Sequence, residues 1–211
     1  MAVASLQRFT VPFDGQGQSN PAQGLLMPKL QYRFRVTFEG FGVSTGDRVE
    51  LTKQIVSFSR PTVSFADVDV HVYNSIVRLA GKHSWGDVSV SIRDDAGSII
   101  TKLIGEQLQK QFDFMEQSSA ASGSDYKFIT RCEMLDGGNG ASKNGGGPNV
   151  LETWELYGCY IKEANYQEVN YANSDPVTIQ MSLRFDNALQ TSGTVGIGTF
   201  IGRTLGENIT L

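Results

Sequence analysis

Strict alternation of apolar and polar residues recurs along this chain, and it limits what the chain can fold into. The clearest run is 177–185, whose apolar positions are Val177, Ile179, Met181, Leu183 and Phe185. A period of two places the two sets on opposite faces of a β-strand, so one face packs while the other meets water or a partner. Similar strand-like runs cover 31–39, 50–58, 68–72, 88–92, 126–135 and 150–161. Antiparallel sheet is the simplest arrangement for about seven such strands.

One segment, at about 97–115, has a helical period instead. Its apolar residues recur at steps of three and four: Ile100, Leu103, Ile104, Leu108, Phe112 and Met115. These residues form a single apolar stripe, so the helix is predicted to cover one edge or face of the sheet. Asp94 or Asp95 is expected to cap the free amide groups of its first turn.

The two ends of the chain, 1–29 and 188–211, are predicted to be arms that flank a β-domain at 30–187. Prolines and glycines interrupt the first arm, and the second is rich in Gly and Thr. Both arms nevertheless carry apolar side chains that need a surface to cover, which a neighbouring subunit could supply. A third irregular stretch, 137–149, contains six glycines and is expected to form a mobile hairpin loop.

The charge balance excludes some classes of protein. A formal net charge of −4 argues against a protein whose main role is to grip nucleic-acid backbone, because such proteins concentrate Lys and Arg. DNA could pass along this protein, but it should not bind to it tightly. The apolar runs are too short to cross a bilayer, and residues 1–8 show no secretory leader. The sequence therefore predicts a soluble protein of the cytoplasm without membrane anchoring.

The two cysteines, Cys132 and Cys159, are too few for a disulfide scaffold or a zinc site. If a hairpin closes around 137–149, Cys132 faces Trp154 and Cys159 faces Lys127. The two thiols are then too far apart for a bond within the chain, whereas a disulfide between subunits stays open.

The sequence carries no enzyme signature. The glycine run lacks the Gly-x4-Gly-Lys-Ser/Thr pattern of a phosphate-binding loop. His83, Ser84 and Asp87 lie close together in an extended segment without a nucleophile elbow, and capping explains the pair Asp94 and Asp95. We therefore expect no enzymatic activity, no catalytic residue, no metal site and no cofactor.

Four segments together resemble the tail tube (inner tube) proteins of contractile-tailed bacteriophages, the T4-like tail tube family. They read LMPKLQYRFRV at 26–36, WGDVSVSIRDD at 85–95, WELYGCYI at 154–161 and LRFD at 183–186. The resemblance spans roughly 26–187. It implies a small antiparallel β-sandwich or half-barrel with one flanking α-helix, whose subunits assemble into a hexameric β-barrel tube.

The resemblance also implies a function and partners. Members of this family stack hexameric rings into the inner tail tube, through which genomic DNA is ejected into the host. The implied partners are further copies of the chain, tail sheath, baseplate and tail terminator proteins, with double-stranded DNA passing transiently. The implied location is the virion tail, assembled in the bacterial host cytoplasm.

The resemblance assigns roles to two sets of residues. In the strand 177–185, the polar set is expected to line the lumen, with an outer solvent-facing sheet as the alternative: Thr178, Gln180, Ser182 and Arg184. Arg184 is expected to pair with a nearby carboxylate. The arms and the segment 66–83 are expected to carry contacts between rings or subunits, through Phe9, Val11, Phe13, Val68, Val70, Val72, Ile76, Leu79, Ile197, Phe200 and Ile201.

Three alternatives stay open at this point. A related tube protein of a type VI secretion system or an R-type bacteriocin shares the same implied architecture. A ligand-binding β-sandwich would gather exposed aromatic side chains on one face, whereas Trp85 and Trp154 lie in strand-like patterns and are predicted to be structural. An unrecognised hydrolase is disfavoured because the expected motifs are missing.

Overall fold

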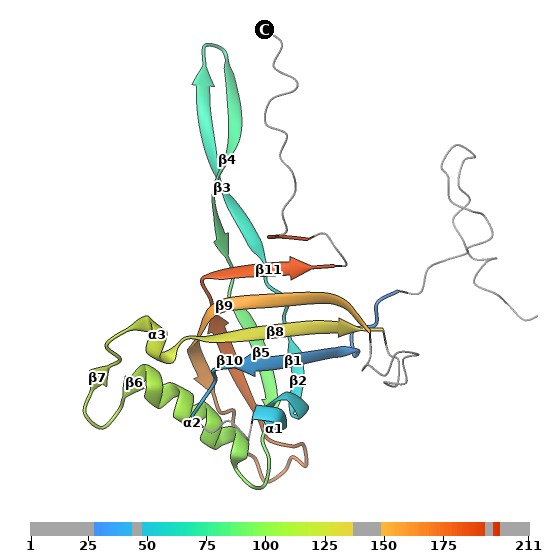
Figure 1. Ribbon diagram of the computed structural model, residues 1–211, viewed down its shortest axis with the longest axis vertical. Helices are drawn as coiled ribbons and strands as arrows, with labels where there is room; N and C mark the ends of the chain where they lie inside the picture. The colour runs from blue at the N-terminus through green and yellow to red at the C-terminus, as the bar shows by residue number, and fades with distance from the viewer. Residues whose placement is uncertain (1–27, 44–47, 137–148, 193–195, 199–211) are drawn as a thin grey trace, which may run out of the picture. The chain divides into compact units, whose positions relative to one another are not determined.

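The computed structural model describes residues 28–43, 48–136, 149–192 and 196–198 (Figure 1). The chain divides into two compact units, Met1–Arg33 and Phe34–Leu211. In the first unit, the described residues 28–33 include a turn in which the Arg33 amide donates to the Leu30 carbonyl oxygen (3.2 Å). The predicted glycine-rich loop and most of both predicted arms lie outside the described residues.

The second unit is built on one seven-stranded sheet whose neighbouring strands are antiparallel. Its order is β1-β8-β9-β10-β5-β2, and β11 also pairs with β9. The strands are β1 (Phe34–Glu39), β2 (Ile55–Phe58), β5 (Val88–Arg93), β8 (Phe128–Leu135), β9 (Val150–Asn165), β10 (Thr178–Arg184) and β11 (Asn187–Thr191). The terminal strands β1 and β2 do not pair, so the sheet is an open half-barrel. The predicted fold class is confirmed.

The long strand β9 bends, and the sheet therefore forms two layers. Its first half pairs with β8 and β11, and its second half pairs with β10. The first layer therefore contains β1, β8, β11 and the start of β9, and the second contains the end of β9, β10, β5 and β2. Figure 1 shows strands of the second layer crossing behind those of the first. The apolar faces of both layers belong to one buried core cluster.

The change of partner along β9 occurs at Gly158. This residue has φ +68°, a left-handed conformation that a side chain disfavours. A Cβ at this position would lie 2.2 Å from the nearest carboxylate oxygen of Asp186. The Asp186 amide donates to the Tyr157 carbonyl oxygen (3.0 Å), and its carboxylate pairs with Lys127 (2.7 Å). A glycine is thus required where β9 bends.

The core follows the predicted alternation. Ile179, Met181 and Leu183 of β10 are buried, and both tryptophans, Trp85 and Trp154, are also buried. In the antiparallel register of β10 with β5, these three β10 residues lie opposite the buried Ile92, Val90 and Val88. Trp154 is held further by its indole N–H, which donates to Glu152 Oε1 (2.7 Å).

Both cysteines are free and buried in this core. Cys132 lies opposite Trp154 as expected, whereas Cys159 lies opposite Phe128 and not Lys127. Burial raises the pKa of Cys132 to about 12 and that of Cys159 to about 11. Thiols held in this way are neutral and shielded, so they are poorly placed to bond another subunit.

The predicted helix is α2 (Ile99–Gln111), which is shorter than the expected 97–115. The Asp95 carboxylate accepts hydrogen bonds from backbone amides at the start of this helix: Oδ1 accepts from the Ile100 amide and Oδ2 from the Gly97 amide (both 3.1 Å). The chain then turns, because Asp113 Oδ1 accepts from the amides of Met115 and Glu116. Phe112 and Met115 therefore leave the helix, and the short elements β6 (Phe112–Asp113), β7 (Ser118–Ser119) and α3 (Gly123–Tyr126) follow.

Two glutamines tie α2 to the sheet. The buried Gln107 accepts from the Gly42 amide (2.9 Å) and donates to the Tyr126 carbonyl (2.7 Å). The amide of Gln111 donates to the Ile161 carbonyl and accepts from the Ile161 amide, both at 2.9 Å. These are the two bonds that a neighbouring strand would make to a residue of β9. The helix therefore covers an edge of the sheet, as predicted.

Two other segments differ from the sequence prediction. The run 50–58 contains a helical turn, α1 (Arg48–Lys53), before β2 begins at Ile55. The segment 66–83 belongs to a separate two-stranded sheet formed by β3 (Val63–Val72) and β4 (Ser75–Trp85). The predicted C-terminal arm begins with β11, which pairs with β9.

Candidate functional site

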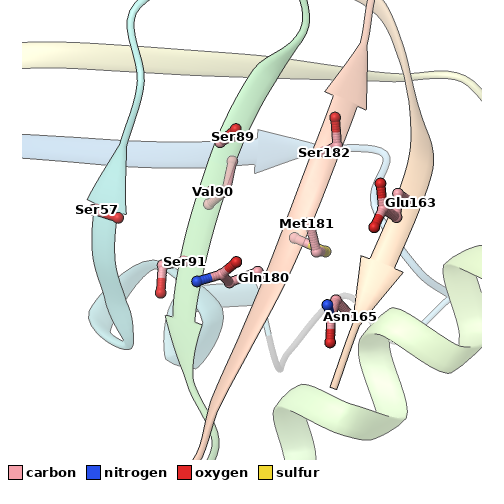
Figure 2. A pocket seen from close by; sticks show the side chains of 9 residues that line it. All are labelled: Ser57, Ser89, Val90, Ser91, Glu163, Asn165, Gln180, Met181 and Ser182. Atoms are coloured by element: carbon pink, nitrogen blue, oxygen red, sulfur yellow. The ribbon is translucent and has the colours of Figure 1, made fainter. Parts of the chain in front are cut away.

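The outward face of the second layer is a continuous polar surface (Figure 2). Ser57, Ser91, Gln180 and Asn165 form one row across β2, β5, β10 and β9, because each lies opposite the next in the strand register. A second row joins three further polar residues of β5, β10 and β9: Ser89, Ser182 and Glu163. Together they line a shallow hollow of about 330 Å³.

The chemistry of this polar face is mostly neutral. Its lining consists of serine hydroxyls, two side-chain amides, one carboxylate at Glu163 and two apolar side chains, and none of the lining residues is basic. Hydroxyls and amides exchange hydrogen bonds with water, but they provide no positive charge for phosphate. Across the ranges that the structure describes, no His, Cys, Asp or Glu side chains gather as metal ligands would. The polar face therefore has the chemistry of a surface that contacts water.

Charged residues at one end of the polar face neutralise one another. Arg184 Nη1 lies 2.6 Å from Asp87 Oδ1, and Lys162 bonds to the other oxygen of Asp87. The pairing of β9 with β10 shifts next to Lys162, where a β-bulge directs this side chain toward Asp87. The hydrogen bond from Lys162, and then that from Arg184, lower the pKa of Asp87. Arg184 thus has the carboxylate partner that was expected.

We expect the stability lost by Asp87→Asn to depend on pH. The pKa of Asp87 is lowered in the folded chain, so the unfolded chain takes up the proton first as pH falls. The stabilisation by this carboxylate is therefore present above an unfolded pKa of about 3.9 and is lost as pH falls through the folded pKa. Urea unfolding should show the difference between wild type and variant shrinking below about pH 4. A difference that stays constant down to pH 2 would contradict this assignment.

The residues predicted to line a lumen lie on β10, whereas the predicted contact residues lie on the hairpin of β3 and β4 and in the arms. Gln180, Ser182 and Arg184 share the polar face, and Thr178 lies at its far end opposite Arg93. The sequence prediction missed the partners from other strands, although Ser89 and Ser91 occupy the alternate positions of the run 88–92. Asp87 and Lys162 carry no such signal. Asp87 is 97 residues from Arg184 in sequence, and Lys162 reaches Asp87 because of a bulge in β9.

The hairpin of β3 and β4 is amphipathic. The register pairs Val68 with Leu79 and Val70 with Val77, and these residues form one apolar face together with Val72. The opposite face carries the pairs Asp69–Arg78 and His71–Ile76. All five residues of the apolar face are between 41% and 52% exposed. An isolated two-stranded hairpin is marginally stable in water, so this face needs a surface to cover it.

The remaining contact candidates are distributed differently. Ile76 lies on the polar face of the hairpin, away from Val70. Ile197 is 42% exposed, and its carbonyl oxygen accepts from the Gln190 amide of β11 (2.8 Å). The other residues predicted in the arms lie outside the described residues: Phe9, Val11, Phe13, Phe200 and Ile201.

The outward face of the first layer carries ion pairs. Arg131 binds Glu155 Oε1 (2.8 Å) and Glu39 Oε1 (3.0 Å), and Arg35 binds Glu133 (2.6 Å). Hydrogen bonds from Tyr157, and then from Arg131, lower the pKa of Glu155. The two outward faces therefore differ. The first carries several ion pairs. The second is mostly neutral, with Glu163 among its polar residues, the paired Arg184, Asp87 and Lys162 at one end and Arg93 at the other.

Solved structures of contractile injection systems contain chains with this arrangement. A chain from the sheath/tube terminator of an extracellular contractile injection system in its extended state superposes with a TM-score of 0.57, at 11% identity over 80% of this chain and 100% of that one. The fold is shared. A chain from the sheath-tube complex of such a system gives 0.56 at 12% identity, over 83% of this chain and 99% of that one.

A third similar chain comes from the tube-terminating cap of the anti-feeding prophage. It has a TM-score of 0.56 at 13% identity, covering 80% of this chain and 94% of that one. No family model matches the sequence, and no curated protein matches it. The chain therefore shares its fold with these chains of contractile injection systems. Within the described residues, no helix is both long and apolar enough to span a bilayer.

Proposed function

We propose that this chain is a structural protein of a bacteriophage virion and forms the inner tail tube. Its subunits assemble into hexameric rings, and the rings stack into a conduit for genomic DNA. The observation that carries the proposal is the amphipathic hairpin, whose apolar face of Val68, Val70, Val72, Val77 and Leu79 has no cover within the described chain. On a fold shared with chains of contractile injection systems, such a face fits contacts between stacked copies.

Two further features support the proposal. The half-barrel ends in the terminal strands β1 and β2, each of which pairs on one side only, and pairing between subunits would remove such exposed edges. The polar face around Gln180 and Ser182 offers no unpaired cluster of cations, so it suits a lumen along which duplex DNA slides. Sheath, baseplate and terminator proteins are the further partners, and the location is a virion tail assembled in the host cytoplasm. The proposal assigns no catalytic role and no cofactor.

A second candidate is the tube of a related particle, such as a type VI secretion system or an R-type bacteriocin. The likeness to chains of extracellular contractile injection systems favours it. The two candidates share the ring and the stack but differ in cargo, because only the phage tube conducts a genome.

The full chain at micromolar concentration should sediment as hexamers and longer polymers, and negative-stain images should show rings and tubes. Val70→Asp places a carboxylate in the middle of the apolar face and is expected to raise the concentration needed for stacking by about tenfold or more while rings persist. Ile76→Asp is the matched control, since Ile76 is also about half exposed (52%, against 41% for Val70) but lies on the opposite face. A wild-type chain that stays monomeric at every salt and concentration would contradict the proposal.

A further inference from the structure

The loop that joins β9 to β10, residues 166–177, is held in a defined conformation by hydrogen bonds. Asparagine side chains fix its backbone at three places: Asn165 Oδ1 accepts from the Gln167 amide (2.9 Å), Asn170 Oδ1 from the Ala172 amide (2.9 Å) and Asn173 Oδ1 from the Asp175 amide (3.1 Å). Such turns hold a loop in one shape. The loop nevertheless exposes apolar side chains to solvent, and the two most exposed are Val169 (77%) and the fully exposed Tyr171.

This β9–β10 loop and the hairpin lie at opposite ends of the same strands. Val88, three residues after the hairpin ends at Trp85, pairs with Leu183 of β10. Arg93, at the other end of β5, pairs with Thr178, the residue that follows the loop. The six residues of β5 span about 20 Å, and the ten residues of β3 span about 33 Å. A hairpin longer than the layer can reach the far end of the same layer in a copy stacked above it.

The two elements both present apolar side chains that lack cover. The apolar face of the hairpin has no cover, and Tyr171 and Val169 are large apolar groups of the kind that anchor interfaces. The loop 166–177 contains Glu168 and Asp175 and no basic residue. On the hairpin, Asp69 and Arg78 pair with each other at 3.6 Å on the face opposite the valines. The apolar groups of the loop can therefore meet the valine face without opposing these charges.

We propose that the β9–β10 loop of one subunit is the receptor for the apolar hairpin face of a second copy, with Val169 and Tyr171 as its anchoring residues. This inference rests on the proposed tube function and names the partner surface of the hairpin. Because the contact joins different surfaces on two identical chains, it is heterologous. It therefore builds an open stack rather than a closed pair.

Disulfide trapping tests the inference in the full chain. Val70→Cys and Tyr171→Cys chains are made separately, mixed, assembled and mildly oxidised, and the products are identified by mass spectrometry. Cys132 and Cys159 are buried, with their pKa values raised to about 12 and about 11, so they should not compete. Met115→Cys is the control receptor, because Met115 is an apolar residue of the β6–β7 turn that is 93% exposed.

We expect the mixture with Tyr171→Cys to give about tenfold or more cross-linked dimer than the mixture with Met115→Cys, since apposed thiols react at millimolar effective concentration. Tubes in which Val70→Cys joins Met115→Cys, or does not join Tyr171→Cys, would overturn the inference and leave the tube function standing. A wild-type chain that never polymerises would overturn both. If Val70→Cys alone prevents stacking, Leu79→Cys on the same face replaces it. The same cross-linking results with Tyr171→Cys and Met115→Cys then test the inference.

Discussion

Gly158→Ala is expected to lower the free energy of unfolding by about 2–3 kcal/mol. Left-handed backbone costs a non-glycine residue about 1–2 kcal/mol. The new Cβ would also lie 2.2 Å from an Asp186 carboxylate oxygen, so that carboxylate must move away and weaken its pair with Lys127. Urea unfolding followed by the fluorescence of the buried Trp85 and Trp154 provides the measurement.

Gly105→Ala is the matched control for this prediction. Gly105 lies within α2, and no atom comes within 4 Å of the position that its Cβ would occupy. Alanine in an open helical position should stabilise the chain by up to about 1 kcal/mol. The same chemical change should therefore have opposite signs at the two glycines. Equal effects at both positions would mean that the bend of β9 does not need a glycine.

The sequence alone predicts the strands whose alternation reflects one buried and one wet face. The run 177–185 shows this best, because Ile179, Met181 and Leu183 are buried while Gln180 is exposed and Ser182 is partly so. These predictions hold because burial dictates alternation directly, without reference to distant parts of the chain.

Other elements depend on information that local patterns lack. Val49 and Leu51 alternate as a strand would, yet they lie in α1, where only Leu51 is buried. The end of α2 is set by hydrogen bonds to Asp113 and not by its apolar period, which continues to Met115. In such short segments the two periods overlap, and single side-chain contacts decide between them.

The candidate site was predictable in part for the same reason. The polar set of β10 followed from the alternation, and its expected role as a lumen lining came from the resemblance. Asp87 is 97 residues from Arg184 in sequence and meets it only because β10 pairs with β5. The position of Lys162 depends on a bulge in β9. The sequence could therefore predict that Arg184 needs a carboxylate, but not which one.

The double variant Gln180→Lys/Ser182→Lys is expected to convert a mostly neutral surface into one that holds DNA. If six subunits form a ring with this face inward, two lysines each add about twelve cations per ring. Tubes assembled with short duplex DNA should then retain it. Because each phosphate contact releases counterions, binding through six to ten contacts should weaken about 10³–10⁵-fold between 50 and 200 mM salt.

The position of the bound DNA distinguishes a lumen from an outer surface. Inside a tube, duplex DNA is shielded from an added nuclease, whereas DNA on the outside is digested although its binding has the same salt dependence. Gln180→Glu/Ser182→Glu is the matched control, which changes the same residues with the opposite charge and should retain no DNA. Protected DNA in the lysine variant would support the lumen assignment. Digested DNA on well-formed tubes would place Gln180 and Ser182 outside and leave the ion-paired face of Arg131 and Glu155 as the candidate lining.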